Sequence, residues 1–139
     1  MEWKKEKMKY KIGDHAKIAK TITETDVYSF AGICGDFNPL HVNEIEAKNT
    51  IFGKRIAHGI LGVSLISTVL GMYLPGPGTI YASQNIQFTK PIYFGDTITA
   101  DVEIVELLQN GRCRLKTQVI NQDNEVVITG EAIVILPKQ

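Results

Sequence analysis

Apolar residues follow strand-like and helix-like spacings in different regions of the chain. The pattern predicts a first strand over residues 12–22, where lysines separate the apolar residues Ala16, Ile18 and Ile22. The next apolar residues recur at helical spacing: Val27, Phe30, Ala31 and Cys34. Thr23 is a suitable N-cap for this helix, because its hydroxyl can accept a hydrogen bond from an amide of the first turn. A second short helix is predicted to follow Asn43 and to run through Lys48.

The middle of the chain contains a long stretch without charge. Residues 56–89 include no Lys, Arg, Asp or Glu, and residues 60–74 are apolar at nearly every position. A helix that is apolar on all sides is buried, either in a protein core or in a membrane. This one would be about 22 Å long, which is shorter than the roughly 20 residues that cross a bilayer. We therefore expect the buried central helix of a globular domain, ended by the Pro-Gly-Pro-Gly sequence at 75–78.

The carboxyl-terminal half consists of strand-like runs at residues 81–88, 97–108, 112–120 and 126–136. Asn110-Gly111 is typical of a two-residue hairpin turn, and residues 121–124 predict another turn, so the last strands are expected to be consecutive and antiparallel. With the central helix, about five strands predict an α+β fold in which a curved antiparallel sheet wraps around the helix. The exposed sheet edges and an apolar seam predict a symmetric homodimer, with a pocket close to the subunit contact.

Composition narrows the classes of partner. The 139 residues are expected to form one domain, 1–139, with residues 1–11 as a flexible charged tail. Fifteen basic and fifteen acidic residues balance, which gives no electrostatic case for a nucleic acid or membrane partner. The amino terminus lacks the apolar stretch of a secretion signal, so we expect a cytoplasmic protein. Cys34 and Cys113 are then expected to be reduced thiols, with Cys34 packed on the apolar face of its helix.

The main candidate for chemistry is the segment 32–41, Gly-Ile-Cys-Gly-Asp-Phe-Asn-Pro-Leu-His. Gly35 and Pro39 predict a stiff, non-helical turn that carries the carboxylate of Asp36 and the imidazole of His41. Two polar groups on a stiff turn can hold one water molecule at a small entropic cost, which is an acid/base arrangement. The same residues also allow a purely structural turn. A metal site is the third interpretation, with Asp36, Asn38, His41 and Glu44 as ligands.

Further motifs follow in order: His58-Gly59 at the start of the apolar helix, then Phe88-Thr89-Lys90-Pro91, then Gly95-Asp96. Together with Gly35-Asp36-x-Asn38-Pro39-x-His41, they make nearly all of the chain after Ile12 resemble the MaoC-like, (R)-specific enoyl-CoA hydratases. The resemblance implies the hot-dog fold. It also implies reversible hydration of a trans-2-enoyl-CoA to the (R)-3-hydroxyacyl-CoA, without metal or redox cofactor and with coenzyme A as part of the substrate. The expected acyl chain is short, as in crotonyl-CoA.

The resemblance also implies roles for particular residues. Asp36 and His41 match the catalytic pair, and the amide of Gly59 matches the oxyanion-hole donor to the thioester carbonyl. Asn38 and Ser67 are expected to position the site. These roles fit the chemistry, because adding water to an enoyl thioester builds negative charge on the carbonyl oxygen, which an N–H at a helix amino terminus stabilises. His41 suits a general base near neutral pH, while Asp36 can hold the same water and pass a proton toward C2 in a syn addition.

Other functions of the same fold stay open, because a fold does not decide an activity. An acyl-CoA thioesterase and a non-catalytic acyl-CoA-binding module are the alternatives, and free thiol or the absence of any reaction would reveal them. His58 is expected to have a structural role in the turn before Gly59. The basic side chains expected near the phosphates of coenzyme A are those of Lys54, Arg55 and Lys90.

Overall fold

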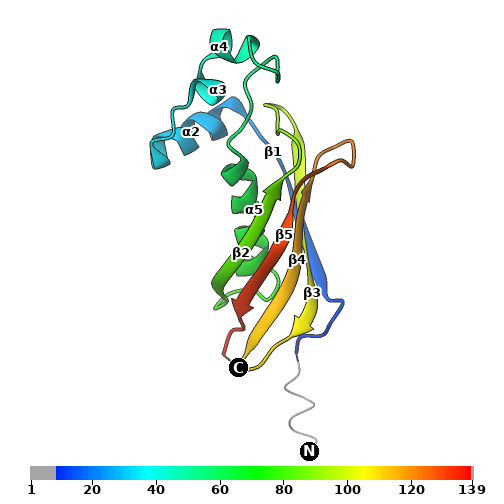
Figure 1. Cartoon of the computed structure of the whole chain (residues 1–139). Helices are drawn as coiled ribbons and strands as arrows, with labels where there is room; N and C mark the ends of the chain where they lie inside the picture. The colour runs from blue at the N-terminus through cyan, green and yellow to red at the C-terminus, as the bar shows by residue number, and fades with distance from the viewer. Residues whose placement is uncertain (1–8, 139) are drawn as a thin grey trace, which may run out of the picture.

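The computed structural model describes residues 9–138, which form one sheet and four helices (Figure 1). In chain order the elements are β1 (His15–Thr21), α2 (Glu24–Cys34), α3 (Pro39–Val42), α4 (Glu44–Lys48), α5 (Gly59–Met72), β2 (Ile80–Phe88), β3 (Thr97–Leu107), β4 (Arg112–Ile120) and β5 (Val126–Ile135). The strands are all antiparallel to their neighbours, in the order β1-β3-β4-β5-β2. Helix α5 lies along one face of the sheet (Figure 1). The predicted α+β hot-dog architecture is confirmed.

Strands β3, β4 and β5 form the predicted meander. Asn110 and Gly111, in the turn between β3 and β4, have φ angles of 61° and 70°, the conformation of a two-residue hairpin turn. Alternate side chains of these two strands face the core, namely Ile98, Ala100, Val102, Ile104, Cys113, Leu115, Thr117 and Val119. Strand β2 pairs with β5 rather than with β3, the next strand in sequence, so β2 is one edge of the sheet and β1 is the other.

Helix α5 buries one side against the sheet and leaves the other side exposed. The buried side contributes Leu65, Ile66, Val69 and Leu70 to the core. Burial of a side chain of this size stabilises the fold by roughly 1.5–3 kcal/mol. On the other side, Ile60, Ser67 and Met72 are exposed in the single chain. The expectation of a helix buried all round is therefore wrong for one copy of the chain, because uniform apolarity does not say which side the sheet covers.

The expected flexible tail over residues 1–11 can be compared with the structure only from residue 9 onward. Residues 1–8 lie outside the described residues. Tyr10, however, is buried in the core cluster, and its hydroxyl donates a hydrogen bond to the main-chain oxygen of Pro75. The prediction that residues 1–11 form a flexible tail is therefore wrong for Tyr10. Across residues 9–138, every helix is too short or too polar to cross a membrane.

The short helices α2, α3 and α4 cluster beyond one end of the sheet (Figure 1). Helix α2 has the predicted cap: the Thr23 hydroxyl accepts from the Asp26 amide, and the Asp26 carboxylate accepts from the Thr23 amide. The helix ends at Gly35, whose φ of 79° suits glycine.

The prediction of a non-helical turn over residues 32–41 is wrong at both ends. Residues 32–34 belong to α2, and His41 lies on the helical turn α3. That turn forms because Pro39 suits the first position of a helix and the Asn38 side chain accepts a hydrogen bond from the Leu40 amide at 3.1 Å. Only residues 35–38 are irregular.

Candidate active site

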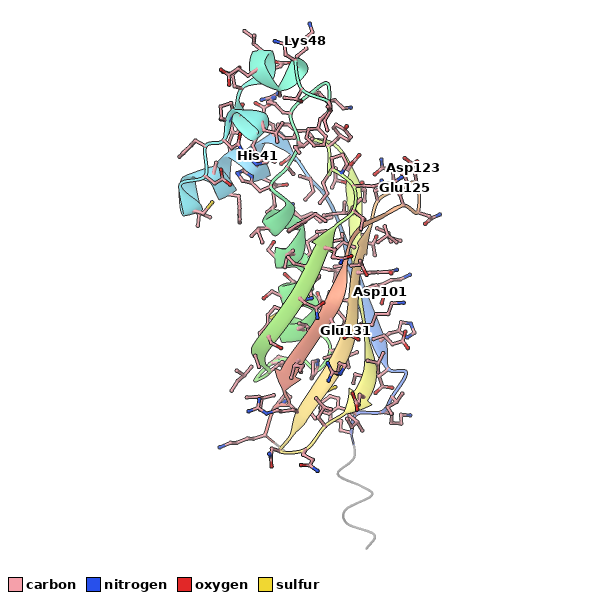
Figure 2. The ribbon with its side chains drawn as sticks, in the orientation of Figure 1. His41, Lys48, Asp101, Asp123, Glu125 and Glu131 are labelled. Atoms are coloured by element: carbon pink, nitrogen blue, oxygen red, sulfur yellow. The ribbon has the colours of Figure 1, made fainter. Side chains whose placement is uncertain are left out.

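A cavity of about 670 Å³ lies between the short helices, the start of α5 and the end of β2. Its polar groups are few and its walls are mostly apolar, which is the usual composition of a small-molecule site. The lining residues are Phe30, Cys34, Asp36, His41, Phe52, Ile56, Ala57, His58, Gly59, Ile60, Phe88, Thr89, Lys90, Pro91, Ile92 and Ile128. Figure 2 shows His41 among the short helices, beyond the end of the sheet. Three predicted site residues therefore share one cavity: Asp36, His41 and Gly59.

His41 is held in a single orientation and tautomer. The ring is 8% exposed, and its Nδ1 lies 2.7 Å from the main-chain oxygen of Ile56. A carbonyl oxygen can only accept, so Nδ1 carries the hydrogen and Nε2 of the neutral ring has a free lone pair. The backbone of Ile56 thus leaves Nε2 as the basic atom of His41.

Asp36 occupies the irregular residues between α2 and α3. Its side chain is 53% exposed, and Oδ1 accepts a hydrogen bond from the Asn38 amide at 3.2 Å. Asn38 in turn caps the helix that carries His41. Asn38 does not line the cavity, so its contribution to the site is to connect the Asp36 turn with the His41 helix.

Gly59 is the first residue of α5, so its N–H has no acceptor within the helix. None of the hydrogen bonds found among residues 9–138 uses this N–H. A Cβ at Gly59 would lie 2.5 Å from Cε1 of Phe88, which is closer than real Cβ contacts. Glycine thus lets the Phe88 ring pack directly over this part of the backbone, and it leaves a donor free at the amino end of a buried helix.

His58 lies between the other polar groups of the site. It is 3% exposed, and its Nε2 is 2.9 Å from the main-chain oxygen of Asp36. The ligand atoms of Asp36, His41 and His58 lie within 4.8 Å of one another, a set that could hold a divalent cation. The metal site suggested by the sequence had Asp36, Asn38, His41 and Glu44 as ligands, whereas the cluster in the structure has His58 in place of Asn38 and Glu44. Two of its ring nitrogens, however, already face main-chain carbonyl oxygens.

Other predicted residues lie away from the chemistry or have different surroundings. Ser67 is exposed on α5 and does not line the cavity of its own chain. Cys34 is exposed and lines the cavity, so the predicted packing role is wrong. Cys113 is the buried cysteine, and burial raises the pKa of its thiol to about 11.

The basic side chains suggested for the phosphates of coenzyme A have partners within the chain. Arg55 donates to the Tyr28 hydroxyl and to the Glu24 carboxylate. Lys90 pairs with Glu125, and the Lys54 ammonium lies over the ring of Tyr93. Only Lys90 of the three lines the cavity.

Two contacts of the site were not predicted from the sequence. The first is the carbonyl of Ile56, a backbone atom for which no residue type is a signal. The second is the ring of Phe88 against Gly59. The Phe-Thr-Lys-Pro motif pointed to Phe88 as part of a pattern, but the contact joins β2 to α5 and depends on the tertiary fold.

Comparisons with known proteins identify the family of the chain. The family model described as MaoC like domain matches residues 7–128. The chain belongs to the MaoC-like domain family. It is 46% identical over 127 residues to an (R)-specific enoyl-CoA hydratase of Rhodospirillum rubrum, covering 91% of this chain and 88% of that one. It is 44% identical over 122 residues to a 3-hydroxybutyryl-CoA dehydratase of Methylorubrum extorquens, covering 88% and 78%.

Among solved structures, the MaoC-like chain is similar to the (R)-hydratase of A. caviae involved in PHA biosynthesis. The two superpose with a TM-score of 0.91 at 38% identity, over 94% of this chain and 99% of the other. A match of this quality, over nearly all of this chain, shows that the two proteins share the same fold.

Proposed function

We propose that this MaoC-like protein is an (R)-specific enoyl-CoA hydratase, a hydro-lyase that interconverts trans-2-enoyl-CoA and (R)-3-hydroxyacyl-CoA. The observation that carries the proposal is the convergence of three groups on one apolar cavity: the carboxylate of Asp36, the imidazole of His41 with its free Nε2, and the N–H of Gly59. Relatives that are 46% and 44% identical over most of the chain are named for the same reaction and its reverse.

The base is His41. Its Nε2 removes one proton from a water molecule as the water oxygen bonds to C3 of the enoyl group. Asp36 accepts a hydrogen bond from the same water and, with His41, relays the removed proton to C2. The water therefore supplies both the hydroxyl and the C2 hydrogen, which makes the addition syn. No other reactant is needed for the atoms to balance, and no metal or redox cofactor takes part.

The N–H of Gly59 stabilises the negative charge that develops on the thioester carbonyl oxygen. As water adds to C3, electrons move through C2 onto the thioester carbonyl oxygen, and the Gly59 N–H donates to that oxygen at the positive end of the α5 dipole. Apolar side chains from α2, α5, β5 and two connecting segments surround the acyl group: Phe30, Ile56, Ile60, Ile92 and Ile128. A cavity of about 670 Å³ accommodates a short acyl chain such as that of crotonyl-CoA, which is the substrate we propose.

The same proposal includes a homodimer. Strand β2 is an edge of the sheet, so one row of its backbone N–H and C=O groups lacks a strand partner within the chain. Large apolar side chains beside this edge are exposed, including Met72, Tyr73 and Ile80. Pairing of two copies along β2 would cover these side chains and the free side of α5, which carries Ser67. Ser67 would then face the other copy, so it would contribute to the site of that copy rather than to the site of its own chain.

Incubation with crotonyl-CoA tests the function. We expect the absorbance of the conjugated enoyl thioester to fall without release of free thiol, and the product to be (R)-3-hydroxybutyryl-CoA, detected with an (R)-specific dehydrogenase. Thiol release would indicate a thioesterase, and binding without either reaction would indicate a non-catalytic module. A product of S configuration would contradict the proposed stereochemistry while leaving hydration intact.

A further inference from the structure

His58 is the buried polar residue of the cavity to which the proposed reaction gives no role. It stands directly before Gly59, and it contacts both Asp36 and His41. We propose that His58 is a positioning residue: its ring, with a hydrogen on Nε2, holds the Asp36 turn and the ring of His41 in register with the Gly59 donor. This inference rests on the hydratase function proposed above and adds a residue to its machinery.

The hydrogen-bond pattern determines the tautomer. Nε2 of His58 lies 2.9 Å from the main-chain oxygen of Asp36, and a carbonyl oxygen can only accept, so Nε2 carries the hydrogen. Nδ1 is buried and has no hydrogen-bond partner among the described residues. A second hydrogen on Nδ1 would be a buried donor without an acceptor, which is costly. Nε2 is thus the donor, and its N–H is committed to the backbone of Asp36.

Two rings fix the plane of the His58 side chain. The His41 ring stacks on it with a centroid distance of 3.9 Å and an interplanar angle of 28°. Phe30 meets it edge-on, with a centroid distance of 5.0 Å and an angle of 61°. His41 is therefore held at one edge by the Ile56 carbonyl and on one face by His58, so its Nε2 has a single direction.

The segment that carries His58 is itself anchored on both sides. The Ile56 amide donates to the Leu40 oxygen at 3.2 Å, and the Ala57 amide donates to the Ile92 oxygen at 2.7 Å. Residues 56–59 consequently touch every part of the site: Ile56 orients the base, His58 holds the Asp36 turn, and Gly59 offers the donor. Loss of the His58 contact would let residues 35–38 move relative to Gly59 without removing any catalytic group.

Two substitutions separate the ring of His58 from its hydrogen bond. His58→Phe keeps a flat ring against His41 but has no donor for the Asp36 oxygen, whereas His58→Gln keeps an N–H near the position of Nε2 and loses the ring. Because small misplacements of reacting groups can reduce rates by about 10²-fold, we expect His58→Phe to lower kcat by about that factor with little change in KM. His58→Gln should recover part of the loss. His15→Phe, at an exposed histidine of β1, is the matched control and should match the wild type.

Nitrogen NMR of the wild-type protein tests the tautomer without any substrate. With labelled histidine, and with signals assigned from the histidine variants, the His58 ring should show a hydrogen on Nε2 that is hydrogen-bonded to a carbonyl oxygen. A His58 ring without a hydrogen on Nε2 would overturn the proposal. So would a folded His58→Phe protein with wild-type kcat. If the wild type fails to hydrate crotonyl-CoA, the function is wrong, whereas the NMR result still decides the state of His58.

Discussion

The proposed catalytic pair consists of one buried and one exposed side chain, and the proposed mechanism gives each a distinct task. His41 is enclosed and bonded to the Ile56 carbonyl, so it acts through a single atom, Nε2. Asp36 is open to solvent and restrained only by the Asn38 amide, so it can meet the water that enters with substrate. A base held at one angle and an acceptor that reaches the same water suit a reaction in which one molecule supplies two atoms.

Removal of either catalytic side chain should abolish most of the activity. We expect His41→Ala and Asp36→Asn each to lower kcat for crotonyl-CoA by about 10²- to 10⁴-fold, the usual contribution of general acid/base catalysis. Circular dichroism and urea unfolding should show that both variants fold. Near wild-type turnover in a folded variant would remove that residue from the mechanism.

Cys34 and Cys113 should differ sharply in reactivity. Cys34 is exposed in the cavity, whereas Cys113 is buried and its thiol has a pKa of about 11, so it stays protonated at pH 8. A thiol reagent should titrate one cysteine in the native protein and the second only after unfolding. Modification of Cys34 should block hydration because the adduct occupies the cavity.

Cys34→Ser separates this blocking effect from a chemical role of the thiol. The variant should keep wild-type activity and should resist the reagent. If it lost activity to the same degree as His41→Ala, the thiol would have to take part in the reaction.

At the residue scale, the sequence motifs pointed to Asp36, His41 and Gly59, and the structure brings these three residues to one cavity. Their catalytic roles are those that the family resemblance implies. The sequence was not sufficient for the orientation of His41. That orientation depends on the carbonyl of Ile56, and every residue offers a carbonyl. The environment of Cys34 was predicted wrongly: helical spacing places it on the face of Val27 and Ala31, which are buried, but in the structure Cys34 is exposed and lines the cavity.

At the element scale, the amino-terminal cap of α2 is a measurable part of stability. Thr23→Ala removes the hydroxyl that accepts from the Asp26 amide, and such changes typically cost about 1 kcal/mol. The midpoint of urea unfolding should fall accordingly. Thr25→Ala, one residue into the same helix, is the control and should have a smaller effect. An equal loss in both variants would mean that helix propensity, not capping, accounts for the change.

The same cap should make stability depend on pH. The hydrogen bond from the Thr23 amide, followed by contacts with Lys20, lowers the pKa of Asp26 despite partial burial. The stabilisation is complete above the pKa of Asp in an unfolded chain, about 3.9, and it is lost as the pH falls through the lower pKa of the folded protein. Asp26→Asn should remove this component from the acid side of the unfolding profile.

Local signals predicted the elements better than their arrangement. The strands and the Asn110-Gly111 turn follow from alternation and from residues that accept positive φ. The pairing of β2 with β5 does not, because it joins residues 80–88 to residues 128–135 across the whole β3–β4 hairpin. The helical turn at His41 does not follow from the same signals, because Pro39 disfavours a helix before it and yet is favoured at the first helical position, which it occupies in α3.

At the scale of the whole molecule, the free edge at β2 leads to a test of assembly. Light scattering after gel filtration should give twice the mass of one chain. Because Ile80 begins the edge strand and is 58% exposed, Ile80→Glu should shift the protein toward the single-chain mass. Ile12→Glu is the control, since Ile12 is 65% exposed but precedes β1 at the opposite edge. A wild-type protein with the mass of one chain at micromolar concentration would contradict the dimer.

Two wall residues of the cavity, Ile92 and Ile128, come from other parts of the chain than its reactive groups. Ile92 and Ile128 line the cavity from the side of the sheet, and both of their Cδ1 atoms would lie 2.8 Å from a Cβ placed on Gly62. Neither residue hydrogen-bonds through its side chain to Asp36, His41 or the Gly59 backbone. Substitution of these two isoleucines should therefore change the size of the cavity, and with it the acyl groups that fit, while Asp36, His41 and Gly59 stay unchanged.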